Sequence, residues 1–555
     1  MKPSTGIPSL DTVLGQLCPG DNVVWQVNAI DDYHSVVKPF VANARSQGDK
    51  LVYFRFARHS QLVQGGDGVE ICTLKPEQGF EKFITEVHDV IRKTGPGGYY
   101  VFDSLSELVL ESYSERMLGN FFMLTCPFLR ELETIAYFAV IKNYHSYYAA
   151  LPISQTTQLL LDVYRREGNI YIHPLKVDGR YSPTMNMLHI WDDDKLTPIP
   201  DSTTITDVVT STPWPGLQSA SYRMVGMWDR RFMQGEDILN TDPDSTSSAK
   251  EQNKIATDTF HSLLRQIISR DNNILKLAEK YFTMADLIHI WKRMIGSGLV
   301  GGKAVGMLLA RAILNKTDPQ WSQFIEAHDS FYVGSDIFYT FLVENQCWDI
   351  REKQKDPATF LDDAAQAREL ITTGNFPDYI VKRFSDMLDY FGQSPIIVRS
   401  SSLLEDAFGN AFAGKYDSVF CANQGTPDQR LEEFIKAVKI VYSSTMSENA
   451  LTYRAQKKVL DRDEQMALLV QRVSGAPYGQ RFFPQVAGVG FSYNPYVWSK
   501  SIDPEAGMLR LVFGLGTRAV DRHDDDYARL VALNAPTKRP ESNIDDQLRH
   551  SQRSV

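Results

Sequence analysis

Hydrophobic residues in the first 200 positions gather in short runs that alternate with longer amphipathic stretches. The runs that we expect to be buried strands are 22–27, 50–56, 98–103, 135–141 and 157–165. Between them, residues 34–47 and 79–94 place apolar side chains three and four positions apart, which predicts helices. Strands alternating with helices of this length indicate an α/β fold, a parallel sheet with helices on both faces.

The second half of the chain has a more mixed pattern. Short apolar runs, which we expect to be strands, occur at 329–335, 395–400, 415–421, 466–475, 488–495 and 509–516. A long amphipathic segment at 428–458 separates two of these runs, and residues 259–282 are also helical in pattern. This half therefore predicts an α+β or α/β domain with a mixed sheet.

A change of composition separates the two halves. Ser, Thr, Asp and Pro are frequent at 201–216 and 240–254, which is typical of surface linkers. The aromatic segment 221–233 between them is too apolar for a free linker, so we expect it to pack on a neighbouring domain. We predict domains at 1–200 and 256–555, joined by the linker 201–255.

Composition and charge narrow the function classes. The chain has 555 residues, 43% of them hydrophobic and 23% charged, which is ordinary for a globular protein of about two or three domains. A formal charge of −10 argues against a protein that binds nucleic acids or anionic membranes non-specifically. No apolar run is long enough to predict a membrane span, and the first residues lack a signal-peptide core.

The five cysteines are scattered along the sequence at positions 18, 72, 126, 347 and 421. Their spacing matches neither a metal site nor a disulfide framework. We expect buried free thiols in a reducing compartment, and hence a cytoplasmic protein.

The opening segment carries Thr5-Gly6-Ile7-Pro8, then Leu10 and Asp11, before the first strand. In this order the residues resemble the start of RecA/KaiC-like domains, in which the strand leads into a phosphate-binding loop. Such a loop needs glycines and a lysine, but residues 28–35 contain neither and include two aspartates. Asp103 ends a strand where that family holds a magnesium-associated acid, but it also fits a helix cap or a turn. The resemblance implies a degenerate domain that docks or senses rather than hydrolysing ATP.

A second segment, 394–420, begins as an apolar strand and continues with Arg399, Ser400, Ser401 and Ser402. A guanidinium binds two phosphate oxygens at once, and hydroxyls can donate to phosphate or orient the arginine. The small turn Phe412–Lys415 follows, where glycine lets backbone amides lie over a polyphosphate. The alternative is a buried Arg399 that pairs with Glu405 or Asp406.

Two further segments have the same double interpretation. Lys303 follows a glycine pair at the predicted start of a helix, where the free amides and the helix dipole favour an anion. The alternative there is a glycine loop that closes on the sheet beside an exposed lysine. The strand 466–475 ends in Gln471-Arg472-Val473, whose backbone could face an adenine edge or form an ordinary core strand and turn.

Taken in order, these segments and the glycines at 488–490 and 514–516 resemble the ATP-grasp domain of the pyruvate phosphate dikinase and phosphoenolpyruvate synthase family. The resemblance covers about 290–535. It implies that Lys303 and Arg399 hold the phosphates of ATP as the catalytic clamp, supported by Ser400 and Ser401. It also implies that Ala413 and Gly414 form a lid over the phosphates. Gln471, Arg472 and Val473 would line the adenine and ribose, and Arg518 or Arg522 would contact the phosphoryl group that is transferred.

One position departs from the family pattern. Arg510 stands where the family has a glutamate that helps to hold metal and nucleotide. Asp521 is the candidate replacement ligand for Mg²⁺, together with the acidic run 524–526. That run fits a solvated turn at least as well, because runs of like charge usually stay in water.

In the family, phosphate passes from ATP to a histidine on a mobile domain. None of the eleven histidines has the expected sequence context; His59, His145 and His523 fit loops or the core. The sequence stops within a polar helical pattern, so we expect either a fragment or a partner of a separate phosphohistidine subunit. The leading hypothesis is the Mg-ATP-binding part of a dikinase-type phosphotransferase. The alternatives are a nucleotide sensor without transfer activity and the ATP domain of an antibiotic- or glucan-phosphorylating relative.

Overall fold

The computed structural model describes residues 2–66, 68–111, 114–142, 144–192, 195–201, 204–205, 208, 226–240, 249–325, 329–405, 414–520 and 527–552. The chain divides into two compact units. The first contains residues 1–390, 398–419 and 426–470, and the second contains 391–397, 420–425 and 471–555. Both predicted boundaries, at 200 and 256, fall within the first unit and stay predictions.

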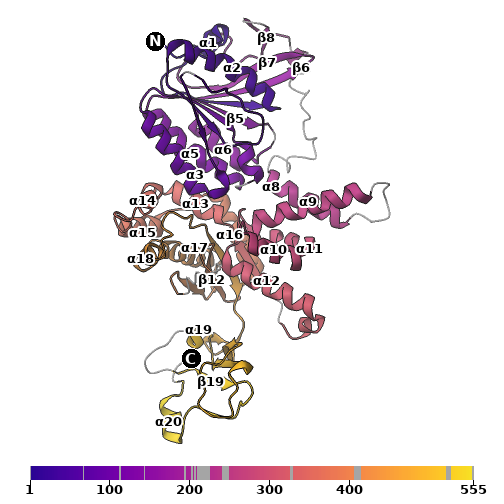
Figure 1. The fold of residues 1–555 in the computed structure, drawn as a ribbon, viewed down its shortest axis with the longest axis vertical. Coiled ribbons are helices and arrows are strands. Elements are labelled where there is room, and N and C mark those ends of the chain that lie inside the picture. The colour runs from indigo at the N-terminus through magenta and orange to yellow at the C-terminus, as the bar shows by residue number, and fades with distance from the viewer. Residues whose placement is uncertain are drawn as a thin grey trace. The chain divides into compact units, whose positions relative to one another are not determined.

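The amino-terminal part of the first unit is built on a nine-stranded sheet with the order β3-β2-β4-β5-β1-β6-β7-β8-β9 (Figure 1). Its strands are β1 (Asn22–Val27), β2 (Leu51–Arg55), β3 (Val69–Thr73), β4 (Tyr99–Ser104), β5 (Ile135–Ile141), β6 (Leu159–Arg166), β7 (Asn169–Val177), β8 (His189–Asp192) and β9 (Lys195–Pro198). The pairs from β3 to β6 are parallel, and those from β6 to β9 are antiparallel. The parallel α/β core is therefore confirmed, and an antiparallel extension that the sequence pattern did not predict adds to it.

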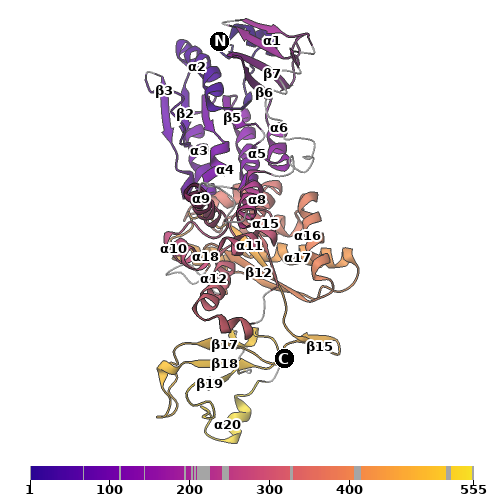
Figure 2. The ribbon, with the colours of Figure 1, turned by 90° about the vertical axis from the view of Figure 1, so that its right-hand side faces the viewer.

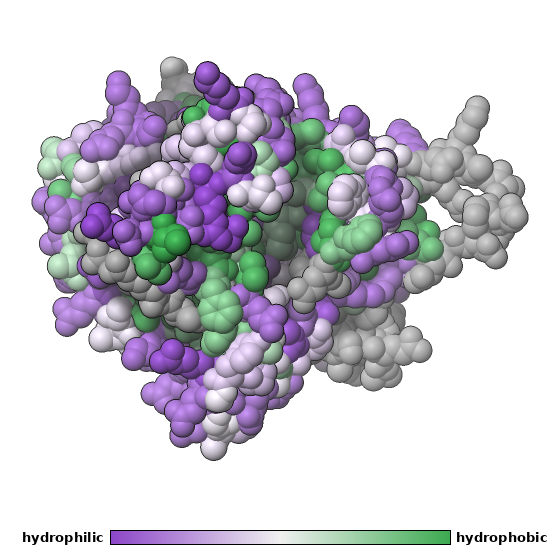
Figure 3. Space-filling model, turned by 90° about the horizontal axis from the view of Figure 1, so that it is seen from below, coloured by the Kyte–Doolittle hydropathy of each residue, from purple (hydrophilic) through white to green (hydrophobic). Residues whose placement is uncertain are grey.

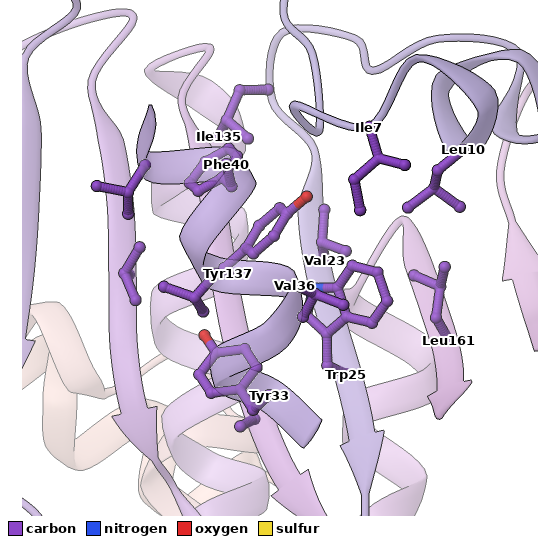
Figure 4. Packing of buried hydrophobic residues seen from close by; sticks show 14 of the residues in the cluster. Ile7, Leu10, Val23, Trp25, Tyr33, Val36, Phe40, Ile135, Tyr137 and Leu161 are labelled. Carbon is purple, nitrogen blue, oxygen red and sulfur yellow. The ribbon is translucent and has the colours of Figure 1, made fainter. Parts of the chain in front are cut away.

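Helices cover both faces of this sheet. They are α1 (Pro8–Leu14), α2 (Ile30–Gln47), α3 (Phe80–Thr94), α4 (Ser106–Glu111), α5 (Glu115–Glu131) and α6 (Tyr147–Thr156). On one face, α2 lays Tyr33, Val36 and Phe40 over the strands, and the ring of Phe40 stacks 3.9 Å from that of Tyr137 (Figure 4). Burying apolar side chains in this way is the main stabilising contribution to such a core.

The opposite face of the sheet carries a row of aromatic rings. Phe54, Phe102 and Phe138 stack across β2, β4 and β5 with neighbouring ring centres 4.6 Å apart. Phe121 and Phe122 of α5 close over this row. Because strand residues alternate between faces, the odd and even positions of the same strands supply the two separate cores.

The rest of the first unit surrounds a five-stranded sheet with the order β10-β11-β14-β12-β13. These strands are β10 (Met294–Ile295), β11 (Ser330–Val333), β12 (Ile396–Ser402), β13 (Ser418–Cys421) and β14 (Met466–Arg472). The helices are α8 (Met227–Asn240), α9 (Ala249–Ile267), α10 (Asn272–Tyr281), α11 (Met284–Lys292), α12 (Gly302–Thr317), α13 (Ser335–Glu344), α14 (Trp348–Lys353), α15 (Ala364–Thr373), α16 (Asp378–Phe391), α17 (Pro427–Ser444) and α18 (Glu448–Gln456).

Local capping signals explain where several of these helices begin. The predicted helical stretch 259–282 is interrupted at Asp271, whose carboxylate accepts the amides of Asn273 and Ile274 and so starts α10. The amphipathic segment 428–458 likewise forms two helices, because Ser447 caps the start of α18. In the aromatic segment, Trp228 and Phe232 are buried, and Phe232 stacks 5.3 Å from Trp291.

The second unit is small and rich in strands (Figure 2). It contains a hairpin of β15 (Ala476–Tyr478) and β16 (Arg481–Phe483), an antiparallel sheet of β17 (Ala487–Phe491), β18 (Met508–Val512) and β19 (Arg529–Ala532), and the helices α19 (Thr517–Val520) and α20 (Ile544–Arg549). Several large hydrophobic side chains are exposed here, including Val486, Ile544 and Leu548. In Figure 3, hydrophobic residues interrupt the polar surface of the face shown.

Candidate functional site

The start of helix α12 packs directly on the turn that follows strand β12. A Cβ atom on Gly301 would lie 1.5 Å from the carbonyl oxygen of Ser401, and one on Gly302 would lie 2.0 Å from that of Glu405. Gly301 also has a φ angle of +83°, which residues with a side chain rarely adopt. The glycine pair is therefore needed for close backbone packing in the structure itself.

Lys303, the second residue of α12, points into this turn. Its Nζ atom donates to Oε1 of Glu405 at 2.7 Å and to Oγ of Ser400 at 2.8 Å. The side chain of Glu405 is only 2% exposed, whereas that of Lys303 is 21% exposed. The ammonium group thus lies at the edge of the buried turn and is held by a carboxylate.

The three serines of β12 each have a distinct buried partner. Ser400 donates to Glu405 at 3.1 Å, and Ser401 donates to the carbonyl of Val300 at 2.9 Å. Ser401 also accepts the backbone amide of Ala304 at 3.1 Å, so its hydroxyl binds one of the free amides of the first turn of α12. Ser402 donates to Oε1 of Glu464 at 2.7 Å. The hydroxyls that we predicted to support Arg399 thus fix the start of α12 and the strand end.

Burial governs the acidity of Glu405. Removal from water raises the pKa of this carboxyl above its ordinary value, and the opposing effects of Lys303 and of hydrogen bonds from Ser402 and Ser400 are smaller. A phosphate group that replaced Glu405 as the partner of Lys303 would therefore leave a carboxyl that accepts a proton readily.

A cleft of about 520 Å³ adjoins this turn, between α10 and α12. Its floor is apolar and includes Ile274, Val305 and Leu309. The glycines Gly301 and Gly302 and the charged or polar residues Arg270, Asp271, Glu405 and Arg462 also line it. The start of α12 therefore borders open space as well as the protein interior.

Arg399 is half-buried on β12, one residue before Ser400. Ser400 and Ser401, adjacent on β12, both bond the start of α12, so strand alternation at this end of β12 does not by itself assign a face to Arg399. Of its two predicted alternative partners, Glu405 binds Lys303, Ser400 and the amide of Ser402, and Asp406 lies outside the described residues. The convergence of Lys303 and Arg399 on one phosphate group stays a prediction.

The residues predicted to line the base belong to the second unit. Arg472 donates to Ser394 and lies over the ring of Phe391, with 5.4 Å between the guanidinium carbon and the ring centre. The amide of Val473 donates to the carbonyl of Pro395 at 2.9 Å, so this donor is already used. Gln471 is half-buried at the end of β14.

The remaining predicted contacts are divided between the two units. Gly414, with a φ angle of +71°, belongs to the first unit, and Arg518 lies in the short helix α19 of the second. Arg510 occupies the central strand β18, and its guanidinium carbon lies 6.0 Å from the centre of the Phe491 ring. Ala413, Asp521, Arg522, His523 and the run 524–526 lie outside the described residues.

In the amino-terminal sheet, Asp103 is fully buried and already bound by several donors. It accepts the hydroxyl of Tyr53, the guanidinium of Arg55 at 2.6 Å, and the amides of Phe56 and Ala57 at 2.8 Å each. A carboxylate with this many donors has little capacity left for a metal ion. The turn interpretation of Asp103 fits these contacts.

The chain between β1 and α2 consists of Asn28 and Ala29 alone. The carboxylate of Asp32, in the first turn of α2, accepts the amide of Ala29 at 3.3 Å and pairs with Arg165 at 2.7 Å. An anion of the chain itself therefore stands at the helix start, where a phosphate-binding loop would place its ligand.

Metal-binding clusters and membrane-spanning helices are both absent from the part of the chain that the structure describes. The described residues hold no group of three or more His, Cys, Asp and Glu side chains arranged to bind a metal ion. Within the same residues, no helix combines the length and the apolar character needed to cross a bilayer.

Sequence reasoning missed the buried residues behind the turn. Glu464 accepts hydrogen bonds from Ser402, from Tyr416 at 2.9 Å, and from Arg454, with which it forms an ion pair. The side chains of Glu464 and Arg454 are each only 1% exposed. A charged residue beside a strand carries no local signal of burial, because its partners come from distant segments.

The carboxy-terminal half is similar to known proteins. Residues 297–554 match the family model of the pyruvate phosphate dikinase AMP/ATP-binding domain, which confirms the resemblance predicted for this part of the chain. A 180-residue stretch is 28% identical to rifampicin phosphotransferase of a Streptomyces species. That stretch covers 30% of this chain and 19% of the relative, so the match spans about a fifth of the relative's length.

Proposed function

We propose that residues 256–555 bind ATP with Mg²⁺ and form the ATP-binding part of a dikinase-type phosphotransferase. The observation that carries this proposal is the match of 297–554 to an AMP/ATP-binding domain, in which Lys303 lies at the start of α12 directly after Gly301 and Gly302, two residues that line a cleft. Phosphoryl transfer depends mainly on positioning and charge neutralisation, and a lysine at a helix start provides both.

Lys303 binds ATP by exchanging its partner. Its ammonium leaves Glu405 for a phosphate oxygen, and the first turn of α12 adds its positive dipole end. Arg399 completes the clamp from β12 as the second cation. Ser400 and Ser401 keep the start of α12 and the strand end in register during this exchange.

The phosphate acceptor is a histidine on another domain, present in the same chain or in a separate subunit. An imidazole nitrogen attacks phosphorus, a P–N bond forms, and the P–O bond to the nucleotide breaks. The proton of the imidazole passes to solvent. The final acceptor is pyruvate, as in phosphoenolpyruvate synthases, or an antibiotic; the similarity to rifampicin phosphotransferase favours keeping the antibiotic as a candidate.

Magnesium is held largely by phosphate oxygens and water in such sites, with one or two carboxylates from the protein. Asp521 remains the candidate protein ligand.

Titration calorimetry with ATP, with and without Mg²⁺, tests this function. We expect binding that requires Lys303 and Arg399, with Lys303→Met and Arg399→Met each weakening it by several-fold to about a hundredfold. Lys316→Met, at the far end of the same helix, and Arg368→Met, on an exposed face of α15, are the matched controls. Equal affinity in the site and control variants would exclude the clamp.

A second candidate is a nucleotide sensor that binds ATP but does not transfer phosphate. Arg510 in the central strand of the small sheet, where the family has a glutamate, favours it. Incubation with radiolabelled ATP and a separately expressed phosphohistidine domain separates the two. Label on the histidine supports the enzyme, and binding without label supports the sensor.

A further inference from the structure

An unbroken series of hydrogen bonds connects the amino-terminal domain to Lys303. The amide of Glu464 donates to Oε1 of Glu81 at 3.2 Å, and Ser402 donates its hydroxyl to Glu464 at 2.7 Å. The amide of Ser402 then donates to Oε2 of Glu405 at 3.1 Å, whose other oxygen accepts Lys303 at 2.7 Å. Glu81, Glu464, Ser402 and Glu405 are each at most 2% exposed.

The first residues of α3 form the amino-terminal end of this series. A Cβ atom on Gly79 would lie 2.3 Å from Oδ2 of Asp463, so only a glycine permits this approach. The same carboxylate oxygen lies 3.4 Å from the amide of Glu81 and accepts its hydrogen bond. Asp463 thus caps a helix of the other domain, and Glu81 in return binds the amide of Glu464.

Buried cations balance the two central acids. Arg351 pairs with Glu81 at 3.0 Å, and Arg454 pairs with Glu464. Both arginines also donate to the carbonyl of Arg462, at 3.3 Å and 2.8 Å. The segment 462–464, just before β14, is therefore held from several sides by buried charged side chains.

Such a network specifies position more than it adds stability. Buried ion pairs contribute little net free energy compared with apolar residues of the same size, whereas their geometry admits few alternatives. Helix α5 also packs against α13, so these charges add to other contacts between the two parts. What the charges determine is the position of residues 402–405 and 463–465.

We propose that Glu81 is a positioning residue for the nucleotide site, and that the amino-terminal domain is an integral part of the ATP-binding module. Glu81 fixes the backbone of Glu464, whose carboxylate holds Ser402, and Ser402 orients Glu405 beside Lys303. This inference rests on the proposed ATP binding. It gives the amino-terminal domain a role in nucleotide binding. The nine-stranded sheet itself offers no such role, because Asp32 stands at the start of α2 and Asp103 is already bound by donors of the chain.

The test uses the full chain and a double-mutant cycle. Glu81→Met removes the acceptor for Glu464, and Glu81→Gln keeps an acceptor oxygen without the charge. Ser402→Ala removes the hydroxyl that donates to Glu464 and accepts the amide of Leu404. We expect ATP affinity to fall about tenfold in Glu81→Met and in Ser402→Ala, and about threefold in Glu81→Gln. Because both substitutions break one series, we expect the double variant Glu81→Met/Ser402→Ala to lose about tenfold rather than a hundredfold.

Asp21→Asn is the matched control. Asp21 is 2% exposed, pairs with Arg180 at 2.7 Å and lies in the same domain, outside the series. It should lower the unfolding temperature as Glu81→Met does, yet leave ATP affinity within twofold when all variants are measured well below their unfolding temperatures. Affinities that follow stability alone, or losses that multiply in the double variant, would overturn the inference.

A second measurement separates this inference from the proposed function. If the unaltered chain binds no ATP, the proposed function fails, and hydrogen exchange of the amides of Ser402 and Glu464 decides the positioning role. We then expect Glu81→Met, but not Asp21→Asn, to accelerate exchange in peptides that contain these residues by at least fivefold. Equal exchange in the two variants would reject the role of Glu81 independently of any nucleotide.

Discussion

The ammonium nitrogen of Lys303 lies 2.7 Å from Oε1 of Glu405, although 102 positions separate the two residues in the sequence. The pair joins the first turn of α12 to the turn after β12. It gives the Lys303 side chain a defined direction, and it gives Glu405 the cation that its burial requires.

Removing Lys303 should expose the cost of burying Glu405. We expect Lys303→Met to lower the free energy of unfolding at pH 7 by about 1–3 kcal/mol, because an unpaired buried carboxylate remains. Burial already raises the pKa of Glu405 above its ordinary value. The free energy of unfolding therefore falls as pH rises from the ordinary pKa to the raised one, where the buried carboxyl becomes charged. The loss should therefore shrink as the pH is lowered and Glu405 takes up its proton, as urea unfolding can measure. Adding Glu405→Gln to Lys303→Met removes the unpaired charge, so the double variant should regain most of the lost stability at pH 7. If the double variant is no more stable than Lys303→Met, this assignment is wrong.

Two glycines near the same turn should respond to alanine in opposite directions. Gly301→Ala places a Cβ 1.5 Å from a backbone oxygen in a left-handed conformation, so we expect a loss of at least about 2 kcal/mol in stability. Gly306 lies within α12, where a Cβ atom would point into open space, so Gly306→Ala should stabilise by about 0.5–1 kcal/mol. Thermal unfolding of the two variants checks the contrast, and equal shifts would contradict the packing at Gly301.

Asp103 should matter for folding and not for ATP. Asp103→Asn removes the negative charge that pairs with Arg55, and it places an amide N–H₂ group where four donors now point at a carboxylate. We therefore expect the free energy of unfolding to fall by about 3–5 kcal/mol. ATP affinity measured below the unfolding temperature should stay within about twofold. A loss of Mg²⁺-dependent ATP binding in this variant would instead indicate a nucleotide site in the first domain.

Acid should destabilise the amino-terminal domain through two buried histidines. Burial, then Arg92 and Lys355, lower the pKa of His88 to about 4, and burial and Arg230 lower the pKa of His145 to about 3. The unfolded chain, with histidine pKa values near 6.5, binds these protons first, so stability is full above pH 6.5 and falls as pH decreases. Each histidine contributes a slope of about 1.4 kcal/mol per pH unit between about pH 6 and pH 4.5.

Urea unfolding at several pH values measures that slope. His88→Gln should reduce it by the contribution of one histidine, whereas His34→Gln, at an exposed position of α2, serves as the control. An unchanged slope in a chain that carries both His88→Gln and His145→Gln would show that other groups govern the acid response.

Hydrophobic patterning predicted the parallel strands β1, β2, β4, β5 and β6 to within two residues of their ends, because buried strands form near-continuous apolar runs. It did not predict β3 or β7 to β9, because these strands lie toward the two edges of the sheet and mix polar and apolar positions. Motif order predicted the resemblance of the carboxy-terminal half to the pyruvate phosphate dikinase ATP-binding domain, and the family match over 297–554 confirms this resemblance.

The sequence by itself determined most of the buried parallel strands and the resemblance of the carboxy-terminal half to a dikinase ATP-binding domain, because hydrophobic period and motif spacing are local properties. Only the tertiary structure decided that the glycines before Lys303 serve backbone packing, that Glu405 pairs with Lys303, and that Glu81 reaches Glu464 across 383 positions. Whether a charged residue is buried, and beside which partner, depends on how distant segments pack, and no neighbouring residue in the chain records it.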